Sequence, residues 1–597
     1  MNILNRNLNS VSGWLIFLTV AGMGWISCTP HTGSQATVKT VMDRVVTDLY
    51  ATAGADELSQ ISQESVFSLF SDDELETLST THWMFDVNVP VVVSVMRSTR
   101  QEHVPFWLTG RGFTPTGEVI KNEQTDYEVW EKNFPKGRVG LGINGFENYG
   151  LHYFVSVAPQ EAGAKLESGN FFPASQYVGV LDNGAFTYHD WTELVVREVP
   201  ETMKGRLLLT TVRGRGVESH LIGAFRSTSH PSSEKPDQLM VTWSSDPSST
   251  IDIQWRTSAT VENGTVIIRE INKEEIKQVP ADKILMEDRL LMNDRYIHRN
   301  TAKITGLEPG TTYQYLILPN NDWSSAPSFT TAPAGNQFSF LWFGDTHNSP
   351  FYGEILTRAW KNHDDIAFLT ISGDLVNDGL HRNQWDDLFA LSEPVISSRP
   401  LMAVPGNHDN RAGLGAGMFR DMFSYPLNGP DGVPKEQTYS FTYQNCLFLM
   451  LDATSSWEGQ TAWLEAQLSG STATWKIAIF HFPPYNHSSP YMGIQEAWVP
   501  LFDKYHVDLV MGGHLHYYMR SHPMKGGKVA GSFSDGTVYA ISIAIPARKN
   551  EIADESYAAV RNQEGHLYQY IAVSENTMTF KSVNINDKVI DEFTIAK

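Results

Sequence analysis

The feature that most constrains this chain is a series of hydrophobic runs in its C-terminal half, each ending in a short polar motif. Helical stretches such as 353–362 and 461–468 separate several runs, and this alternation predicts an α/β domain. Polar side chains at the carboxyl ends of strands in such a sheet meet along one edge. We therefore expect one site built from five motifs: Gly344-Asp345-Thr346-His347, Gly373-Asp374-Leu375-Val376-Asn377, Gly406-Asn407-His408-Asp409, His481 after Ile477-Ala478-Ile479-Phe480, and Gly513-His514-Leu515-His516.

The side chains in these motifs are carboxylates, a carboxamide and imidazoles, with no thiolate. Mixed oxygen and nitrogen ligands suit Fe, Mn or Zn better than Ca or an iron–sulfur cluster. Asp345 and His347 are two residues apart, as are His514 and His516, and this spacing points both side chains to one side of an extended segment. Together the motifs supply enough ligands for two metal ions about 4 Å apart.

The motif order D-x-H, G-D, G-N-H-D, H and G-H-x-H resembles that of the calcineurin-like metallophosphoesterase superfamily, over about residues 336–530. The segment 513–523, together with a sandwich-like block just before the α/β region, looks more narrowly like purple acid phosphatases. The resemblance implies a layered α/β/β/α catalytic domain with two bound metal ions.

The resemblance also implies a role for each motif residue. His408 would not be a ligand but would protonate the leaving oxygen, with Asp409 orienting its ring. The two ions would lower the pKa of a bridging water, so that hydroxide attacks phosphorus. A general acid of this kind is worth roughly 10²–10⁴-fold in rate. The implied ligands are Asp345, His347, Asp374 and His516 for the first ion, and Asp374, Asn407, His481 and His514 for the second, with Asp374 shared.

Two positions depart from the purple acid phosphatase pattern. Those enzymes have Gly where this chain has His347, and a metal-binding Tyr where it has Asn377. The changes are complementary, because a Tyr oxygen is lost and an imidazole is gained at the same metal. The ferric–tyrosinate pair that colours those enzymes should be absent. We expect a colourless or weakly coloured protein, in which Zn or Mn fits as well as Fe.

Two further side chains are candidates for substrate contact. His487, in the loop after His481, could face the substrate as histidines of this loop do in the resembled enzymes, or it could be a solvated loop residue. Arg520 could contact phosphate, although a structural ion pair is the favoured interpretation.

The remainder of the chain predicts further domains. Residues 41–78 have helical spacing, and strand-like runs extend to about residue 222, so 41–230 reads as a helical segment plus a β-rich domain of unknown role. Ser71-Asp72-Asp73-Glu74 has the form of a capping box. Residues 237–333 resemble a fibronectin type III β-sandwich, because segment 306–315 pairs a turn with a corner Tyr. The metallophosphoesterase domain would fill 336–597.

The N-terminal residues have the form of an export signal. An apolar stretch from Trp14 to Ile26 follows Arg6 and is too short to span a membrane. Its ending, Ile26-Ser27-Cys28, resembles the lipobox of bacterial lipoproteins, although Trp25 stands where Leu is usual. The resemblance implies a signal peptide over 1–28, lipidation of Cys28, a tether over 29–40 and a periplasmic or outer-membrane location. Ordinary signal cleavage or a retained anchor would also export the protein.

Composition narrows the choice of substrate. The formal charge of −22 disfavours nucleic-acid binding, which needs Lys and Arg to displace counterions. We expect a phosphorylated small molecule or polymer, and the domain arrangement favours a phosphomonoester. A phosphodiester, nucleotide or pyrophosphate substrate is an alternative. An alternative of another class is a surface binding protein with a vestigial or secondary phosphoesterase site, which recognises a polymer or partner through residues 40–230. The intact ligand set argues against a dead site.

Overall fold

The computed structural model describes residues 36–486, 491–547 and 555–597. Cys28 and the rest of the predicted export signal lie outside the described residues, and so does His487. Within the described ranges, no helix combines the length and apolar character that a membrane crossing requires.

Four short helices open the described chain: α1 (Val38–Thr52), α2 (Ala55–Ser59), α3 (Gln63–Val66) and α4 (Asp72–Thr80). The predicted capping box is present, because Ser71 Oγ accepts from the Glu74 amide at 3.4 Å while the Glu74 carboxylate accepts from the Ser71 amide at 2.9 Å. Helix α1 buries Met42 and Val46, which lie one turn apart on one face, against Phe146 and Leu221 of the following region. The helices therefore belong to the core of the β-rich region.

The β-rich region contains a three-stranded sheet, ordered β5-β1-β7, and an eight-stranded sheet, ordered β8-β11-β6-β2-β4-β3-β10-β9. Trp83 and Trp107 are fully buried in its aromatic core. The predicted β-rich fold is confirmed. Its elements are β1 (Trp83–Val87), β2 (Val91–Ser98), α5 (Phe106–Gly110), β3 (Thr114–Asn122), β4 (Asp126–Phe134), β5 (Gly137–Leu141), β6 (Phe154–Pro159), β7 (Ser168–Phe172), β8 (Tyr177–Val180), β9 (Phe186–Tyr188), β10 (Trp191–Glu198), β11 (Leu207–Thr210) and η2 (Arg213–Ser219).

A β-sandwich of two four-stranded antiparallel sheets follows, ordered β12-β13-β17-β16 and β15-β14-β18-β19. The corner Tyr expected from the sequence is Tyr313, whose hydroxyl accepts a hydrogen bond from the Glu308 amide at 3.0 Å and so ties the turn before its strand. The strands are β12 (Asp237–Thr242), β13 (Thr250–Ser258), β14 (Thr265–Glu270), β15 (Lys277–Pro280), β16 (Asp282–Glu287), β17 (Tyr296–Thr305), β18 (Thr312–Ile317) and β19 (Ser328–Thr330), with η3 (Trp323–Ser325) before the last.

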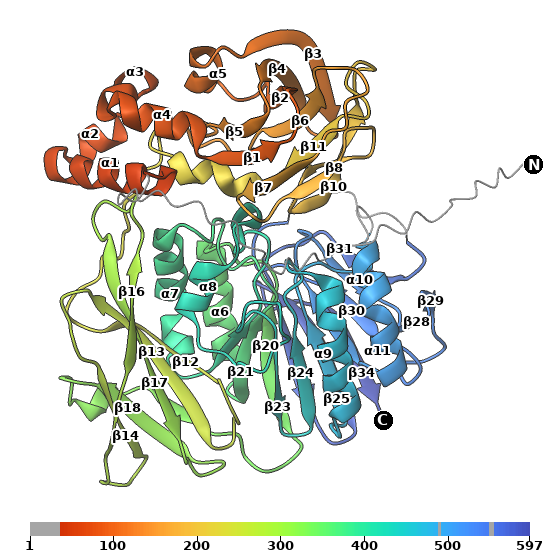
Figure 1. The fold of residues 1–597 in the computed structure, drawn as a ribbon. Helices are drawn as coiled ribbons and strands as arrows, with labels where there is room; N and C mark the ends of the chain where they lie inside the picture. Colours follow the sequence, from red (N-terminus) through yellow and green to blue (C-terminus); the bar gives the residue numbers. More distant parts are fainter. Residues whose placement is uncertain (1–35, 487–490, 548–554) are drawn as a thin grey trace, which may run out of the picture. The chain divides into compact units, whose positions relative to one another are not determined.

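The C-terminal domain is built on two mixed sheets, ordered β22-β21-β20-β32-β33-β34 and β23-β24-β25-β26-β30-β27-β31 (Figure 1). Its elements are β20 (Phe338–Phe343), α6 (Pro350–Asn362), β21 (Ile366–Ile371), α7 (Arg382–Ile396), β22 (Leu401–Ala403), η4 (Arg411–Gly413), α8 (Gly417–Met422), β23 (Tyr439–Tyr443), β24 (Cys446–Met450), α9 (Trp457–Gly470), β25 (Trp475–Ile479), α10 (Met492–Ala497), α11 (Val499–Tyr505), β26 (Leu509–Gly512), β27 (Tyr518–Ser521), β28 (Met524–Lys525), β29 (Lys528–Val529), β30 (Val538–Ile541), β31 (Ala558–Asn562), β32 (Leu567–Val573), β33 (Thr577–Asn584) and β34 (Val589–Ala596).

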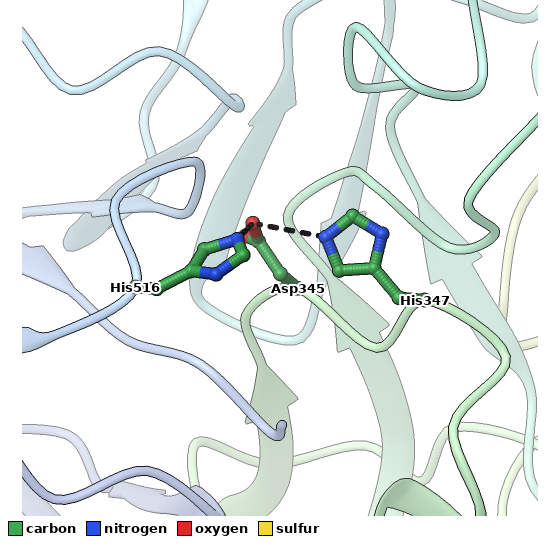
Figure 2. A group of neighbouring side chains, drawn as sticks. All are labelled: Asp345, His347 and His516. Atoms are coloured by element: carbon green, nitrogen blue, oxygen red, sulfur yellow. Dashed lines mark ion pairs between the residues drawn. The ribbon is translucent and has the colours of Figure 1, made fainter. Parts of the chain in front are cut away.

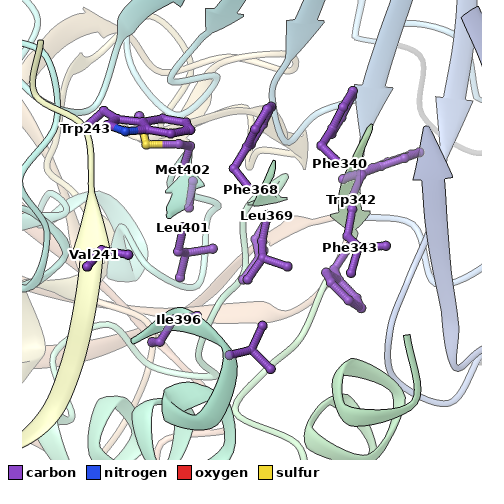
Figure 3. Packing of buried hydrophobic residues seen from close by; sticks show 14 of the residues in the cluster. Val241, Trp243, Phe340, Trp342, Phe343, Phe368, Leu369, Ile396, Leu401 and Met402 are labelled. Atoms are coloured by element: carbon purple, nitrogen blue, oxygen red, sulfur yellow. The ribbon is translucent and has the colours of Figure 1, made fainter. Parts of the chain in front are cut away.

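The two sheets pack face to face through aromatic side chains. Phe340 of β20 and Phe368 of β21 stack with ring centroids 5.0 Å apart, and both meet Phe448 of β24 edge-on. Figure 3 shows Phe340 and Phe368 in the wider buried cluster, to which Trp243 of the sandwich region also belongs. Helices α6 and α7 cover the outer face of the first sheet, and α9 to α11 cover that of the second. The expected α/β/β/α layering is the observed one.

The five motifs follow the carboxyl ends of β20, β21, β22, β25 and β26. The first three strands pair in parallel in one sheet, and the last two pair in parallel in the other. The expectation of a single sheet edge is therefore wrong. The motifs instead come from two sheets whose carboxyl-end edges meet, and an isolated bridge between Asp345 and Ile543 joins them at that point.

A buried polar network fixes the sandwich against the C-terminal domain. Arg256 of β13 donates to the Asp386 carboxylate of α7 at 2.7 Å, and Gln238 donates to the same oxygen at 2.9 Å. Arg382 on the same helix contacts Asp386 and Asp294 at 3.3 and 3.1 Å. Breaking one partner of such a buried pair is strongly destabilising, so this network holds α7 in place.

Candidate metal centre

Close backbone turns bring the motifs together. A Cβ on Gly406 would lie 2.2 Å from Asp374 Oδ1, and a Cβ on Gly344 would lie 1.6 Å from the Ser542 carbonyl oxygen. Only Gly permits these approaches. His347, Asp374 and His514 adopt left-handed backbone conformations with φ of 46°, 53° and 71°. Each such conformation costs a non-Gly residue about 1–3 kcal/mol, and such residues concentrate at functional sites. Three of the seven predicted ligands are thus held in strained backbone conformations.

The first predicted ligand group gathers around the buried carboxylate of Asp345. Its Oδ2 lies 3.2 Å from His516 Nε2 and 3.7 Å from His347 Nε2 (Figure 2). Its Oδ1 accepts a hydrogen bond from the His514 amide at 2.7 Å, which fixes the orientation of the carboxylate. One carboxylate oxygen and two imidazole nitrogens thus point at a common position.

The second predicted ligand group gathers around Asn407. Its Oδ1 lies 2.9 Å from His514 Nδ1 and 3.1 Å from His481 Nε2. His481 Nε2 is also 3.2 Å from Asp374 Oδ2. Two imidazoles, a carboxamide oxygen and a carboxylate oxygen therefore converge, as the sequence predicts.

Asp374 connects the two groups. Its Oδ2, which faces His481, lies 3.8 Å from His347 Nε2 of the first group. Its Oδ1 accepts a hydrogen bond from the His408 amide at 2.9 Å. The carboxylate therefore stands between the two ligand sets, where the resemblance implies a shared ligand.

The residues present fit two metal ions. Asp345 Oδ2 and His347 Nε2, which face the common position of the first group, are buried and make no hydrogen bond to the described residues. Unsatisfied buried polar atoms are rare in folded proteins and call for an explanation such as an ion. Among the described residues, the His, Cys, Asp and Glu groups with suitable spacing for an ion all lie here.

Electrostatics in the cluster favour ionised carboxylates. Burial opposes charge on Asp374, but the neighbouring His481 outweighs it and lowers the pKa of Asp374 to about 2. Burial likewise opposes charge on His481, yet Asp374 raises the pKa of His481 to about 9. Burial and the charge of His481 lower the pKa of His514 to about 3. A cation can therefore replace the proton held between Asp374 and His481.

Two groups that the sequence did not indicate orient the imidazoles. The Tyr491 hydroxyl lies 2.7 Å from His514 Nε2, so His514 Nδ1 faces Asn407. His481 Nδ1 donates to the Ser372 carbonyl at 3.0 Å, which leaves Nε2 for the cluster. Partners of this kind fix the ring orientation of metal-binding histidines. No sequence motif marks Tyr491, which precedes His514 by 23 residues.

His408 lies beside the cluster, with its ring centroid 4.8 Å from that of His347. Its Nδ1 lies 2.7 Å from the Asn377 carbonyl oxygen, which can only accept, so Nδ1 carries a proton. A ring nitrogen of His408 also lies within 4.8 Å of potential ligand atoms of His347 and Asp374. This arrangement suits the general acid that the resemblance implies.

Asp409 does not contact the His408 ring, contrary to expectation. Its buried carboxylate accepts from the backbone amides of Leu375 and Gly406 at 3.0 and 2.9 Å. Burial, followed by the charge of Asp374, raises the pKa of Asp409 to about 7. Asp409 therefore ties together the loops after β21 and β22, and the Asn377 carbonyl orients His408 in its place.

Asn377 stands where the purple acid phosphatase pattern has a metal-binding Tyr. In this chain its side chain stabilises a loop. Its side-chain amide donates to the His347 carbonyl at 3.1 Å and to Asn348 Oδ1 at 3.1 Å. It therefore stabilises the left-handed backbone that presents the His347 imidazole. The two departures from the purple acid phosphatase pattern are physically linked, because the residue replacing Tyr supports the residue replacing Gly.

Arg520 is not positioned for substrate contact. Its guanidinium contacts both oxygens of the Asp591 carboxylate, at 2.5 and 3.2 Å, and lies over the Phe593 ring. Tyr518 donates to the same carboxylate at 2.8 Å. The structural ion pair, favoured from the sequence, is the observed arrangement, and the substrate-binding alternative is wrong.

Comparisons with known proteins agree with this geometry. Residues 338–518 match the family model described as calcineurin-like phosphoesterase, and residues 236–331 match that described as purple acid phosphatase, N-terminal domain. The chain therefore carries a calcineurin-like phosphoesterase domain preceded by a purple acid phosphatase N-terminal domain. This second match identifies more closely the sandwich that resembles fibronectin type III.

Two curated relatives illustrate the similarity. An uncharacterized protein of Mycobacterium tuberculosis is 28% identical over 322 residues, which cover 46% of this chain and 60% of that protein. Purple acid phosphatase 22 of Arabidopsis thaliana is 27% identical over 240 residues, which cover 37% of this chain and 52% of that protein. The chain thus spans about half to three-fifths of the length of these relatives.

A solved structure shares the fold over a longer range. Purple acid phosphatase PPD1 from yellow lupin (Lupinus luteus) seeds aligns with a TM-score of 0.53 and 15% identity, covering 87% of this chain and 91% of that chain. At this identity the likeness concerns the fold alone. Its coverage exceeds residues 236–597, so the similarity of fold reaches into the β-rich region.

Proposed function

We propose that this chain is a dinuclear metal-dependent phosphoester hydrolase that prefers phosphomonoesters. The observation that supports this most directly is the position of Asp374, whose Oδ2 lies 3.2 Å from His481 and 3.8 Å from His347. A carboxylate that stands between two convergent sets of oxygen and nitrogen ligands suits a pair of metal ions.

Seven side chains would hold the ions, in the two sets that share Asp374. Their oxygen and nitrogen atoms suit Fe, Mn or Zn. Two bound ions supply positive charge for the phosphate oxygens and make hydroxide available near neutral pH. The full set is Asp345, His347, Asp374, Asn407, His481, His514 and His516.

The chain itself would supply the proton for the leaving group. His408 is half-buried at the edge of the cluster, and its Nδ1–H is bound to the Asn377 carbonyl. A protonated His408 would therefore present Nε2–H to a leaving alkoxide. Because phosphoryl transfer depends mainly on positioning and electrostatic stabilisation, no nucleophilic side chain is needed.

The preference for monoesters rests on relatives named as purple acid phosphatases and on the matched N-terminal domain. Parallel assays with an aryl phosphomonoester and the matching bis-aryl diester test it. We expect the monoester to be hydrolysed faster. Hydrolysis of the diester alone would favour a phosphodiesterase, and hydrolysis of neither would point to a nucleotide, pyrophosphate or polymer substrate.

The decisive variant is Asp374→Asn, with exposed Asp364→Asn in the same domain as its matched control. We expect Asp374→Asn to abolish hydrolysis while circular dichroism reports an unchanged fold, and Asp364→Asn to retain wild-type activity. Full activity in a well-folded Asp374→Asn protein would refute the proposal and favour a binding protein.

We also propose that the protein is exported and anchored in the cell envelope through lipidated Cys28. Support comes from the sequence pattern before Cys28 alone. Expression in a bacterium with radiolabelled palmitate tests this, with Cys28→Ala as the variant and Cys446→Ala, a buried cysteine, as the control. Label should be lost only in Cys28→Ala, and equal labelling of both variants would exclude this anchor.

A further inference from the structure

A sixth polar motif, Asp452-Ala453-Thr454, follows a strand of the second sheet. The strand is β24, which pairs in parallel with β25, the strand that leads to His481. The Leu451 amide donates to the Ile479 carbonyl at 2.9 Å, so the two strands stay paired up to the motif. The motif therefore lies at the same carboxyl-end edge as His481.

The carboxylate of Asp452 is fully buried but is bound by its own loop. Its Oδ1 accepts from the Thr454 amide at 2.8 Å and from the Thr454 hydroxyl at 2.6 Å, and its Oδ2 accepts from the Ser455 hydroxyl. Among the described residues, Asp452 belongs to none of the groups whose spacing suits an ion. The carboxylate thus holds the loop in one conformation.

Buried side chains behind Asp452 fix this loop on the domain core. The Asp452 amide donates to Thr438 Oγ1 at 2.9 Å, and that hydroxyl donates to Gln460 Oε1 at 2.7 Å. The side-chain amide of Gln460 donates to the Asp452 carbonyl at 2.8 Å. All three residues are fully buried, so Thr454 is presented from a rigid support.

Thr454 contacts the loop that carries His408. The Asn410 side-chain nitrogen donates to Thr454 Oγ1 at 2.6 Å, while Asn410 Oδ1 accepts from the Gly415 amide at 2.9 Å. Because the Asp452 carboxylate can only accept, the proton of the Thr454 hydroxyl points to Asp452 and a lone pair faces Asn410. Thr454 therefore joins the two loops by hydrogen bonds of fixed direction.

Asn410 also closes the turn that holds His408. Its amide donates to the Gly406 carbonyl at 3.0 Å, and His408 lies between these two residues. The turn is bound to the first sheet by the His408 amide, which donates to Asp374 Oδ1 at 2.9 Å. Its far end is bound to the second sheet through Asn410 and Thr454. These two anchors together fix the place of His408 beside the metal centre.

We infer that Thr454 is a positioning residue for the proposed phosphoester hydrolysis, and that it acts through Asn410 to set the distance between His408 and the leaving oxygen. The inference rests on the proposed function, with His408 as the general acid. Proton transfer requires a donor within about 2.6–3.2 Å of its acceptor, so a small shift of the turn matters. Neither Thr454 nor Asn410 belongs to the predicted ligand set, so replacing them should leave the ions bound.

The test uses the full-length, metal-loaded protein and two esters whose leaving groups differ in their need for a proton. Thr454→Val removes the hydroxyl and nearly keeps the shape of the side chain. We expect kcat to fall about tenfold on glycerol 2-phosphate and to stay within about threefold of wild type on p-nitrophenyl phosphate, with the metal content unchanged. Thr454→Ser, which keeps a hydroxyl, should restore the activity. Thr461→Val, whose hydroxyl bonds within α9, is the matched control.

A double variant tests whether Thr454 acts through Asn410. Asn410→Ala should lower kcat on glycerol 2-phosphate at least as much as Thr454→Val does. The double variant should be no slower than Asn410→Ala, because its second change removes a contact that is already lost. Effects that multiply would show independent roles and overturn the inference. An unchanged kcat, equal losses on both esters or loss of bound metal in Thr454→Val would overturn it as well.

Failure of the proposed function would look different. If the wild type hydrolyses neither ester, hydrogen exchange of the segment 406–416 decides the anchoring of the turn separately. Faster exchange in Thr454→Val and Asn410→Ala, but not in Thr461→Val, would support the anchor. Exchange at the wild-type rate in Thr454→Val would overturn it.

Discussion

Two groups of buried histidines in this molecule share the same burial but differ in their neighbours. In the β-rich region, fully buried His82 and His152 lie with their Nε2 atoms 2.8 Å apart and their rings stacked. At the sheet edge of the catalytic domain, equally buried His481 lies 3.2 Å from the carboxylate of Asp374.

The neighbouring charges give the pKa shifts of these buried histidines opposite directions. Burial, assisted by the charge of Arg215, lowers the pKa of His82 to about 4. Although Glu218 lies 3.4 Å from His82, Arg215 contacts the same carboxylate and offsets its charge. At the catalytic edge, Asp374 overcomes burial and raises the pKa of His481 to about 9. The buried carboxylate of Asp374 thus distinguishes the candidate metal centre from the buried histidine pair of the β-rich region.

The largest effect should come from removing a ligand. We expect His481→Ala to lower the bound metal from two ions per chain and to reduce kcat more than about 10³-fold, beyond the 10–100-fold cost of disturbing a residue that only orients a ligand. Metal analysis and kinetics measure both. His82→Gln should keep two ions, and loss of metal in that variant would erase the distinction between the two groups.

A smaller loss is expected when the proton donor is removed and the ligands are kept. We expect His408→Asn to reduce kcat by about 10²–10⁴-fold with full metal content. Because p-nitrophenolate needs little protonation, the loss should be smaller for p-nitrophenyl phosphate than for glycerol 2-phosphate. Equal losses of kcat on both esters would show that His408 is not the general acid.

The buried pair of His82 and His152 should make the β-rich region less stable at low pH. The pKa of His82 is about 4 in the folded protein against an ordinary 6.5, so the unfolded chain binds more protons between these values. Stability is therefore full above pH 6.5 and falls toward pH 4, by about 3 kcal/mol for this residue. Hydrogen exchange of β1 should accelerate over that window.

Replacement variants distinguish the effect of His82 protonation from unspecific destabilisation at low pH. His82→Gln should flatten the pH dependence of exchange in β1, whereas exposed His189→Gln should not. An unchanged pH dependence in His82→Gln would show that another group is responsible.

The sequence predicted those features of the structure that depend on neighbouring residues in the chain. The run 338–343 reads as a strand and is one, because a short, mostly apolar segment bounded by polar residues is typical of a strand that is covered on both faces. The ligand positions follow from motifs that end such strands. The contacts of Asp374, Asn407 and His514 therefore agree with expectation.

Contacts between distant residues were not predictable in this way. Arg520 pairs with Asp591, which is 71 residues away, and nothing near either residue marks the partner. Asp409 follows His408 directly, yet it points to backbone amides that the turn at Gly406 brings close. Division of the motifs between two sheets depends on strand order, which the hydrophobic pattern does not encode.

The smallest expected effect concerns Tyr491, the contact that sequence reasoning missed. Its hydroxyl faces His514 Nε2 at 2.7 Å, and its ring stacks on Phe482 with centroids 4.7 Å apart. Tyr491→Phe should keep the stacking and lose only the oxygen, so metal affinity should fall about tenfold, with a matching loss of activity that added metal restores. Tyr505→Phe, whose hydroxyl contacts Glu465 away from the site, is the control. Rescue by metal would place Tyr491 among the residues that orient a ligand, and a loss of kcat that excess metal does not restore would instead indicate contact with the substrate.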